Sequence, residues 1–244
     1  MKVNTQIVTQ AALNLLNKVG LEELTLRLLA RELDVQAASI YWHFKNKREL
    51  LDAMSSTILT EGPRRLGPST DPADWSTWIA TFGVALRQNL LVYRDGARLV
   101  SATRPAHPEY LTSLERIAEK LTSSGFNPRQ VVLLLSTVYN FTLSFVIEEQ
   151  TVFPRPNERS RLYNISKRIK KLDPEKFPTL RKTTRISLEH FDLRYREAMA
   201  LILGGAKRLS RPVPTLTAAQ METLGLTSAP KPRRKNRARK KRKR

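Results

Sequence analysis

The stretch SIYWHFKNKRELLDAM (Ser39–Met54) places three aromatic residues and a histidine within four consecutive positions and then continues as an amphipathic helix. Ile40 and Phe44 are four residues apart, so a helix would place both on one face, where we expect them to contact the core. The neighbouring side chains would then lie at the rim of the core or beyond it: Ser39, Tyr41, Trp42 and His43. The residues alone leave two interpretations, a partner-binding surface or a core cluster of Tyr41, Trp42 and Phe44.

Two short helical patterns surround this stretch. One covers residues 26–33 and begins after Thr25, which has the side chain of an N-cap, and the other covers residues 36–44. Asp34 and Val35 form a tight connection between them. Two short helices joined in this way can form a helix-turn-helix, whose second helix enters the major groove of DNA. The polar tips of aromatic side chains beside that groove can reach phosphates.

The rest of the chain also shows helical periodicity, so we predict an all-α protein. Residues 151–182 are basic and rich in proline, which favours a long loop with about one helical turn. After residue 230 the chain should be disordered. The remaining predicted helices cover residues 5–19, 46–60, 72–93, 95–101, 107–124, 128–150, 183–204 and 217–224.

Charge and composition limit the function. The 244 residues carry a net charge of +21 and no cysteine, which excludes disulfides and thiolate chemistry. Residues 155–185 hold eleven basic and three acidic residues, and residues 231–244 hold eleven basic and no acidic ones. No stretch approaches the apolar length of a membrane span. Because no catalytic triad, phosphate loop or metal-ligand spacing occurs, we expect neither an enzyme nor a metal or cofactor site.

A longer stretch, LTLRLLARELDVQAASIYWHFKNKRELLDAM (Leu24–Met54), resembles the DNA-binding domain of the TetR (tetracycline repressor-like) family, over roughly residues 4–60. Downstream, YRDGARLVSATRP (Tyr93–Pro105) resembles the tetracycline-responsive members of that family. The resemblance implies a helix-turn-helix domain in residues 1–60 and a larger helical ligand-binding and dimerisation domain in residues 61–210. Residues 211–244 form an extension that ends in the disordered basic tail, 231–244.

The resemblance also implies which residues contact DNA. Arg27 matches a base-reading position, and Ala37 stands where a larger polar side chain would contact adenine, so we expect a different operator. Asp34 stands where the family commonly has glycine, and aspartate tolerates the left-handed conformation of such a turn. Further operator-facing positions are Ala38, Ser39 and Tyr41, and matches to phosphate contacts are Thr25, Trp42, His43 and Lys47.

A ligand pocket is implied in the same way. Val100 stands where tetracycline-responsive relatives have a metal-binding histidine, and Phe82 replaces an amide, so magnesium–tetracycline is not the expected main ligand. A hydrophobic or anionic small molecule suits this pocket better, although Val100, Phe82 and Leu86 could instead be core residues only. The full set of implied pocket positions is Arg64, Phe82, Leu86, Val100, Thr103, Arg104, Pro105, Arg116 and Glu148.

These observations predict a homodimeric repressor that binds a palindromic operator and is released by a small-molecule effector. Helices 128–150 and 183–204 are the expected dimer interface, and the bacterial cytosol, at the nucleoid, the expected location. The tail would bind polyanions without sequence preference. Four alternatives stay open: activation instead of repression, an effector that strengthens DNA binding, an architectural DNA-binding protein dominated by its basic segments, and a small-molecule enzyme, which only scattered carboxylates support.

Overall fold

The computed structural model describes residues 4–65, 75–103, 108–155 and 158–207, with no side-chain detail for residues 61–65. The described part is all-helical and contains no β-strand, which confirms the predicted fold class. The predicted helix 217–224 and the basic tail lie outside the described residues, as does the start of the predicted helix 72–93.

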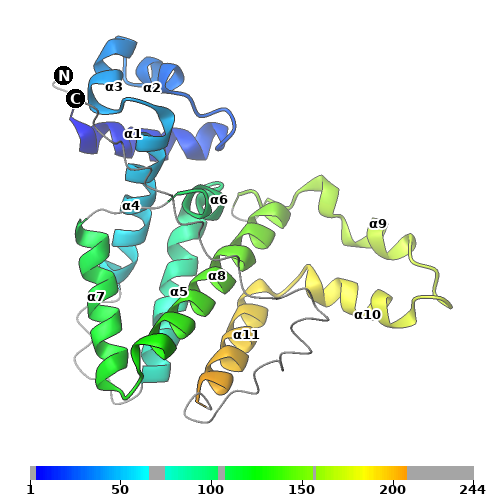
Figure 1. Cartoon of the computed structure of the whole chain (residues 1–244). Coiled ribbons are helices and arrows are strands. Elements are labelled where there is room, and N and C mark those ends of the chain that lie inside the picture. The colour runs from blue at the N-terminus through cyan, green and yellow to red at the C-terminus, as the bar shows by residue number, and fades with distance from the viewer. Residues whose placement is uncertain (1–3, 66–74, 104–107, 156–157, 208–244) are drawn as a thin grey trace, which may run out of the picture. The chain divides into compact units, whose positions relative to one another are not determined.

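Three helices form the N-terminal head, drawn in blue in Figure 1: α1 (Thr5–Val19), α2 (Leu26–Glu32) and α3 (Ala37–His43). The side chain of Asn4 caps α1, and Gly20 ends it with a φ of 83°. Asp34, in the turn between α2 and α3, has a φ of 52°, which confirms the expected left-handed conformation. Local capping and turn residues therefore fix the geometry of the helix-turn-helix.

Helix α4 (Lys47–Arg65) connects the head to the body of the protein (Figure 1). Its first turn is capped by Asn46, whose Oδ1 accepts from the Glu49 N–H at 3.0 Å. The Glu49 carboxylate accepts from the backbone N–H of Lys45, the residue before Asn46, at 2.9 Å. The helix packs against α1 in the head and continues five residues beyond the predicted end at residue 60.

The body is a layer of helices around α8 (Pro128–Val152). Asn127 and Gln130 form the capping box that starts α8, and α5, α6, α7 and α11 pack around the helix. In Figure 1, α5, α8 and α11 lie beside one another, with α7 on the opposite side from α11. These neighbours are α5 (Trp75–Val92), α6 (Gly96–Ser101), α7 (Pro108–Ser123) and α11 (Phe191–Ala206).

The prediction of one continuous helix over residues 183–204 was wrong. The chain instead forms α10 (Pro178–Ser187), breaks, and restarts as α11 after His190, which has a φ of 53°. Phe191 and Tyr195 are buried against the body, while α10 contributes no buried residue. We attribute the break between α10 and α11 to the burial of the first turn of α11. The apolar periodicity of residues 183–204 does not show this break.

The prediction of a long loop over residues 151–182 was also wrong. Helix α8 continues to Val152, and the segment contains η1 (Arg161–Tyr163), α9 (Ile165–Lys170) and the start of α10. Asn164 caps α9 by accepting from the Lys167 N–H at 2.9 Å. Residues 158–187, here termed the basic arm, project from the body in Figure 1. The guanidinium of Arg181 joins α10 to α9 through the carbonyl oxygens of Ile169 and Leu172.

Helix α8 corrects two further expectations. Its length and composition would suffice for a membrane span, contrary to the prediction that no stretch comes near this, although a core helix of a soluble protein meets the same criteria. The high apolar content of residues 128–150 also predicts burial on most sides, but Val132 and Leu133 are exposed within the single chain. Buried neighbours such as Leu134 and Val138 make α8 a core helix with one uncovered face.

Candidate DNA-binding face and ligand cavity

Helix α3 separates its anchors from its exposed aromatic residues. Ile40 and Phe44 are 0% and 4% exposed and belong to the main core cluster. Tyr41 and Trp42 are 47% and 83% exposed, so the core-cluster interpretation holds only for Phe44. Large apolar side chains on a surface mark a contact site when polar residues surround them. The outer face of α3 therefore has the composition of an interface.

The remaining base-facing candidates lie on the same head. Arg27 on α2 and Ala38 and Ser39 on α3 are exposed. Ala37 is half-buried and packs against the core, so its methyl group is the least available of the set. Helices α2 and α3 contact each other directly. This packing places the exposed Arg27 on the helix next to the one that carries the aromatic residues.

The three other DNA-contact candidates make internal contacts. The Nδ1 of His43 lies 3.4 Å from the Thr5 hydroxyl, and its ring packs edge-on against Trp42. The Thr25 hydroxyl accepts from the Leu28 N–H at 3.1 Å and caps α2. Lys47 donates its ammonium to the Leu21 carbonyl at 3.3 Å. Each of the three side chains therefore stabilises the head, independently of any contact with DNA phosphates.

A cavity of about 190 Å³ lies in the body, between α4, α5, α7 and α8. Apolar side chains provide most of its wall, and none of the described residues that line it is charged. Burial of this kind favours neutral, largely apolar ligands, because a charged group would lose its hydration without an ionic partner. The main apolar lining residues are Leu59, Phe82, Ala85, Leu86, Ile117 and Leu135.

A few polar groups interrupt this wall. Asn89 on α5 is 1% exposed, and its Nδ2 donates to the Ile58 carbonyl at 3.4 Å. The cavity is also lined by Tyr110 of α7 and Tyr139 of α8. Burial raises the pKa of Tyr110 above its ordinary value. A few polar groups of this kind can orient a ligand in an otherwise apolar pocket.

The structure brings together only some of the implied pocket residues. Phe82 and Leu86 line the cavity. Thr103 is buried beside it, where its hydroxyl bonds the Ser55 hydroxyl at 2.8 Å and lines an adjoining hollow shared with Tyr110 and Tyr139. Val100 is fully buried in the core cluster, not in the cavity wall.

The charged candidates are elsewhere. Arg116 is exposed on α7, and Glu148 is exposed on α8, 3.6 Å from the Arg194 guanidinium. Arg64 lies in the last turn of α4, where side chains are not described, and Arg104 and Pro105 are outside the described residues. Among the described residues, no three histidine or acidic side chains gather where they could hold a metal ion.

Sequence reasoning missed a buried ionic network in the body. The Arg87 guanidinium on α5 forms two hydrogen bonds, of 2.6 and 2.9 Å, with the Glu149 carboxylate on α8. It also bonds Asp192 on α11 at 2.6 Å and lies over the ring of Tyr195. Burial opposes the charge on Arg87, but the bonds to Glu149 and Asp192 outweigh it and raise the pKa of Arg87. One arginine thus ties three helices of the body together.

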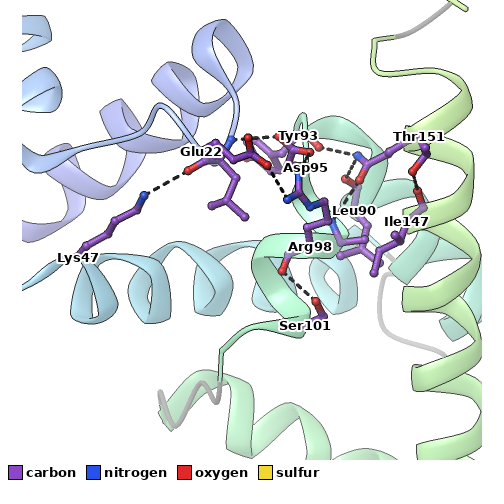
Figure 2. A network of polar contacts seen from close by, with 12 residues as sticks. Glu22, Lys47, Leu90, Tyr93, Asp95, Arg98, Ser101, Ile147 and Thr151 are labelled. Carbon is purple, nitrogen blue, oxygen red and sulfur yellow. Dashed lines mark hydrogen bonds and ion pairs between the residues drawn. The ribbon is translucent and has the colours of Figure 1, made fainter. Parts of the chain in front are cut away.

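A second polar network joins the head to the body, as Figure 2 shows. Asp95, in the left-handed turn before α6, accepts from the Leu21 N–H at 3.0 Å. Arg98 bonds both Asp95 and Glu22 of the head. The side chain of Gln150 on α8 donates to the Tyr93 carbonyl at 2.7 Å, which fixes the same turn from the side of the body. A movement of α6 would therefore reach the α1–α2 loop directly.

Comparison with known proteins agrees with both halves of this arrangement. Residues 8–54 match the model of the bacterial regulatory proteins of the tetR family, and residues 67–209 match the tetracyclin repressor-like C-terminal domain. The chain is 42% identical, over 149 residues, to the class A tetracycline repressor protein from transposon 1721 of Escherichia coli. That alignment covers 61% of this chain and 68% of the relative.

Solved structures give the same result. A possible TetR family transcriptional regulator from Streptomyces coelicolor A3(2) superposes with a TM-score of 0.75 and 30% identity, over 84% of this chain and all of that one. A variant of TetR from Acinetobacter baumannii AYE, in complex with minocycline, superposes with a TM-score of 0.67 and 31% identity, over 87% and 97% of the two chains. The chain therefore belongs to the TetR family of bacterial transcriptional regulators.

Proposed function

We propose that the protein is a dimeric repressor that binds a palindromic operator through α3 and leaves it when a small molecule fills the cavity of the body. The observation that carries this proposal is the pairing of an exposed recognition helix with an apolar cavity in the body. TetR family regulators bind operator DNA and small molecules and act as dimers. In this division of labour, residues 1–60 read DNA, residues 61–210 bind the ligand and the partner, and residues 211–244 extend the chain.

The operator should differ from that of the tetracycline repressors. Arg27 can bind a guanine through two hydrogen bonds, and exposed Ser39 and Tyr41 supply hydroxyls beside it. Ala37 offers only a methyl group, which suits a thymine methyl and cannot bond adenine. Trp42, His43, Thr25 and Lys47 would position the head on the phosphates.

The effector should differ as well. Val100 cannot ligate a metal and is fully buried, and Phe82 places a ring in the cavity wall. Magnesium–tetracycline is therefore not the proposed main ligand. The uncharged wall favours the hydrophobic of the two ligand classes considered from the sequence, because Arg116 is exposed and does not line the cavity.

The proposed signal passes through α6. Leu59 on α4 and Leu86 on α5 line the cavity, and α6 packs against both helices. Asp95 and Arg98 then connect the start of α6 to the head. A ligand that favours one arrangement of these helices would change the separation of the two heads in the dimer, so that both recognition helices no longer meet successive major grooves.

The proposed dimer interface consists of α8 and α11. These helices pack against each other and leave apolar side chains uncovered, among them Val132 and Leu133 on α8 and Leu193 and Leu201 on α11. Two such helices from each of two chains would form a four-helix bundle and cover these side chains.

Replacing Leu201 by glutamate should convert the dimer into a monomer, because it places a charge in an apolar interface. We expect half the molar mass in light scattering and a loss of operator affinity of more than about tenfold, since a monomer contacts one half-site only. The matched control is Leu111→Glu on α7, 50% exposed, which should remain dimeric. Dimers of equal stability for both variants would place the interface elsewhere.

Within a bacterial cell, this function places the protein in the cytosol, on the nucleoid. The basic arm and residues 231–244 would add binding to any polyanion, with strong salt dependence. An architectural DNA-binding role is the second candidate, favoured only by these two basic segments.

A further inference from the structure

An outer hollow of about 490 Å³ adjoins the apolar cavity of the body. Tyr110 of α7 and Tyr139 of α8 line both spaces, so their side chains mark the boundary between them. Leu143 and Ile147 give the outer hollow some apolar wall. Its other described lining residues carry hydroxyl or amide groups: Ser101, Thr103, Asn140 and Ser144. The inner space is therefore mainly apolar, and the outer one is rich in hydrogen-bonding groups.

A ligand can reach the polar groups of the outer hollow. Asn140 and Ser144 are exposed on α8, and neither side chain forms a hydrogen bond within the part of the chain that the structure describes. The amide of Asn140 offers two donors and one acceptor, and the hydroxyl of Ser144 can donate or accept. A hydroxyl, amide or carbonyl group of a ligand would find a partner here, whereas an apolar group would displace water from these residues without replacing its bonds.

We propose that the effector is an amphiphile whose apolar ring or chain fills the inner cavity and whose hydrogen-bonding end passes Tyr110 and Tyr139 to bond Asn140. The inference rests on the proposed function, because it takes the cavity to be the effector site. A cavity of about 150 Å³ can hold benzene, so the inner volume of about 190 Å³ suits a small ring system, and a longer molecule extends into the outer hollow. Apolar burial supplies the affinity, and Asn140 selects the end group.

Calorimetric titration of the full chain with matched probes tests the inference. Hydrocinnamyl alcohol and butylbenzene have the same ring and tails with equal numbers of heavy atoms, which end in a hydroxyl or a methyl group. We expect both probes to bind the unmodified protein. In Asn140→Leu, the affinity of the alcohol relative to butylbenzene should fall by about threefold to tenfold, the effect of one hydrogen bond. An unchanged ratio, or no binding of either probe, would overturn the inference.

A shorter pair of probes tests whether the contact lies beyond the tyrosines. Benzyl alcohol and ethylbenzene carry the same two end groups on tails that are two carbon atoms shorter. With the ring in the inner cavity, their ends should not reach Asn140, so Asn140→Leu should change the ratio of their affinities by less than about twofold. An equal change in the long and the short pair would overturn the proposed placement of the polar end.

The matched control is Thr137→Leu. Thr137 is exposed on α8 one turn before Asn140 and is not among the described lining residues of either space. Since both residues lie on the uncovered side of α8, an altered dimer would affect both variants. The ratio of the long pair should shift in Asn140→Leu and stay unchanged in Thr137→Leu. Equal shifts in both variants would contradict a contact in the outer hollow.

Site and function are checked separately. Ala85→Phe on α5 should fill the inner cavity and abolish binding of all four probes, and Leu114→Trp on α7 does the same from the opposite wall if the first variant does not fold. Probe binding that survives in a folded variant would overturn the proposed site. Operator affinity is measured without probe. Its absence in the unmodified protein would contradict the proposed function, whereas normal operator binding with an unchanged probe ratio in Asn140→Leu would contradict only the inference about the outer hollow.

Discussion

Replacing Arg87 by methionine should destabilise the protein by about 3–5 kcal/mol, the usual cost of removing one partner from a buried ion pair. The change leaves the Glu149 carboxylate, 8% exposed, without its two hydrogen bonds. It also frees Asp192 at the start of α11 and removes the cation from the ring of Tyr195. Urea unfolding at one fixed protein concentration measures the loss, because dimer stability depends on concentration.

The matched control for this prediction is Arg155→Met. Arg155 pairs with Glu158 at 3.4 Å and is largely exposed, so its loss should change stability by less than about 0.5 kcal/mol. Combining Arg87→Met with Glu149→Leu should recover much of the stability, since an apolar pair of similar size no longer buries a lone charge. A loss below about 1 kcal/mol in Arg87→Met would mean that water reaches Glu149 and the network does not fix the three helices.

Replacing Arg27 by alanine should reduce operator affinity by at least about 30-fold while the fold is unchanged. A two-bond contact from arginine to guanine contributes about 1–3 kcal/mol, and the dimer makes it twice. Arg27 is exposed, so its removal leaves no cavity. Fluorescence anisotropy with the operator duplex gives the affinity, and the melting temperature confirms the fold.

Arg129→Ala is the control for the loss of one positive charge per chain. Arg129 is exposed at the start of α8, in the body, and should leave operator affinity within about twofold. Arg27→Ala should also relax the sequence preference at one position in each half-site. Equal losses for the two variants would mean that Arg27 contributes general charge and does not read a base.

The sequence predicted the head well because its determinants are local. The spacing of Ile40 and Phe44 and the side chain of Thr25 act within one helical turn. Aspartate at position 34 tolerates the left-handed turn that the structure shows. Such signals do not depend on what the rest of the chain does. Body helices with clear apolar periodicity were also predicted correctly, as for α8, which begins at the predicted residue 128.

The missed features depend on contacts between distant residues. Arg87 and Asn89 are polar residues in the mostly apolar second half of α5, which was the available signal. Local sequence patterns do not identify Glu149 as the partner of Arg87, because 62 positions separate the two residues. The break at His190 follows from the burial of Phe191. The basic, proline-rich composition around Asn164 favoured a loop in the sequence analysis, although Asn164 caps α9. Pocket positions carried over by resemblance gave Phe82 and Leu86 but not Asn89.

Selection of bound duplexes from a random DNA library most directly tests the claim that the protein is a sequence-specific dimeric regulator. The full chain is used at near-physiological salt, with an unrelated polyanion to occupy its basic segments. We predict enrichment of a palindrome whose half-site centres lie about 34–36 Å apart, one turn of the double helix. Binding without an enriched palindrome would contradict the account and favour the architectural role.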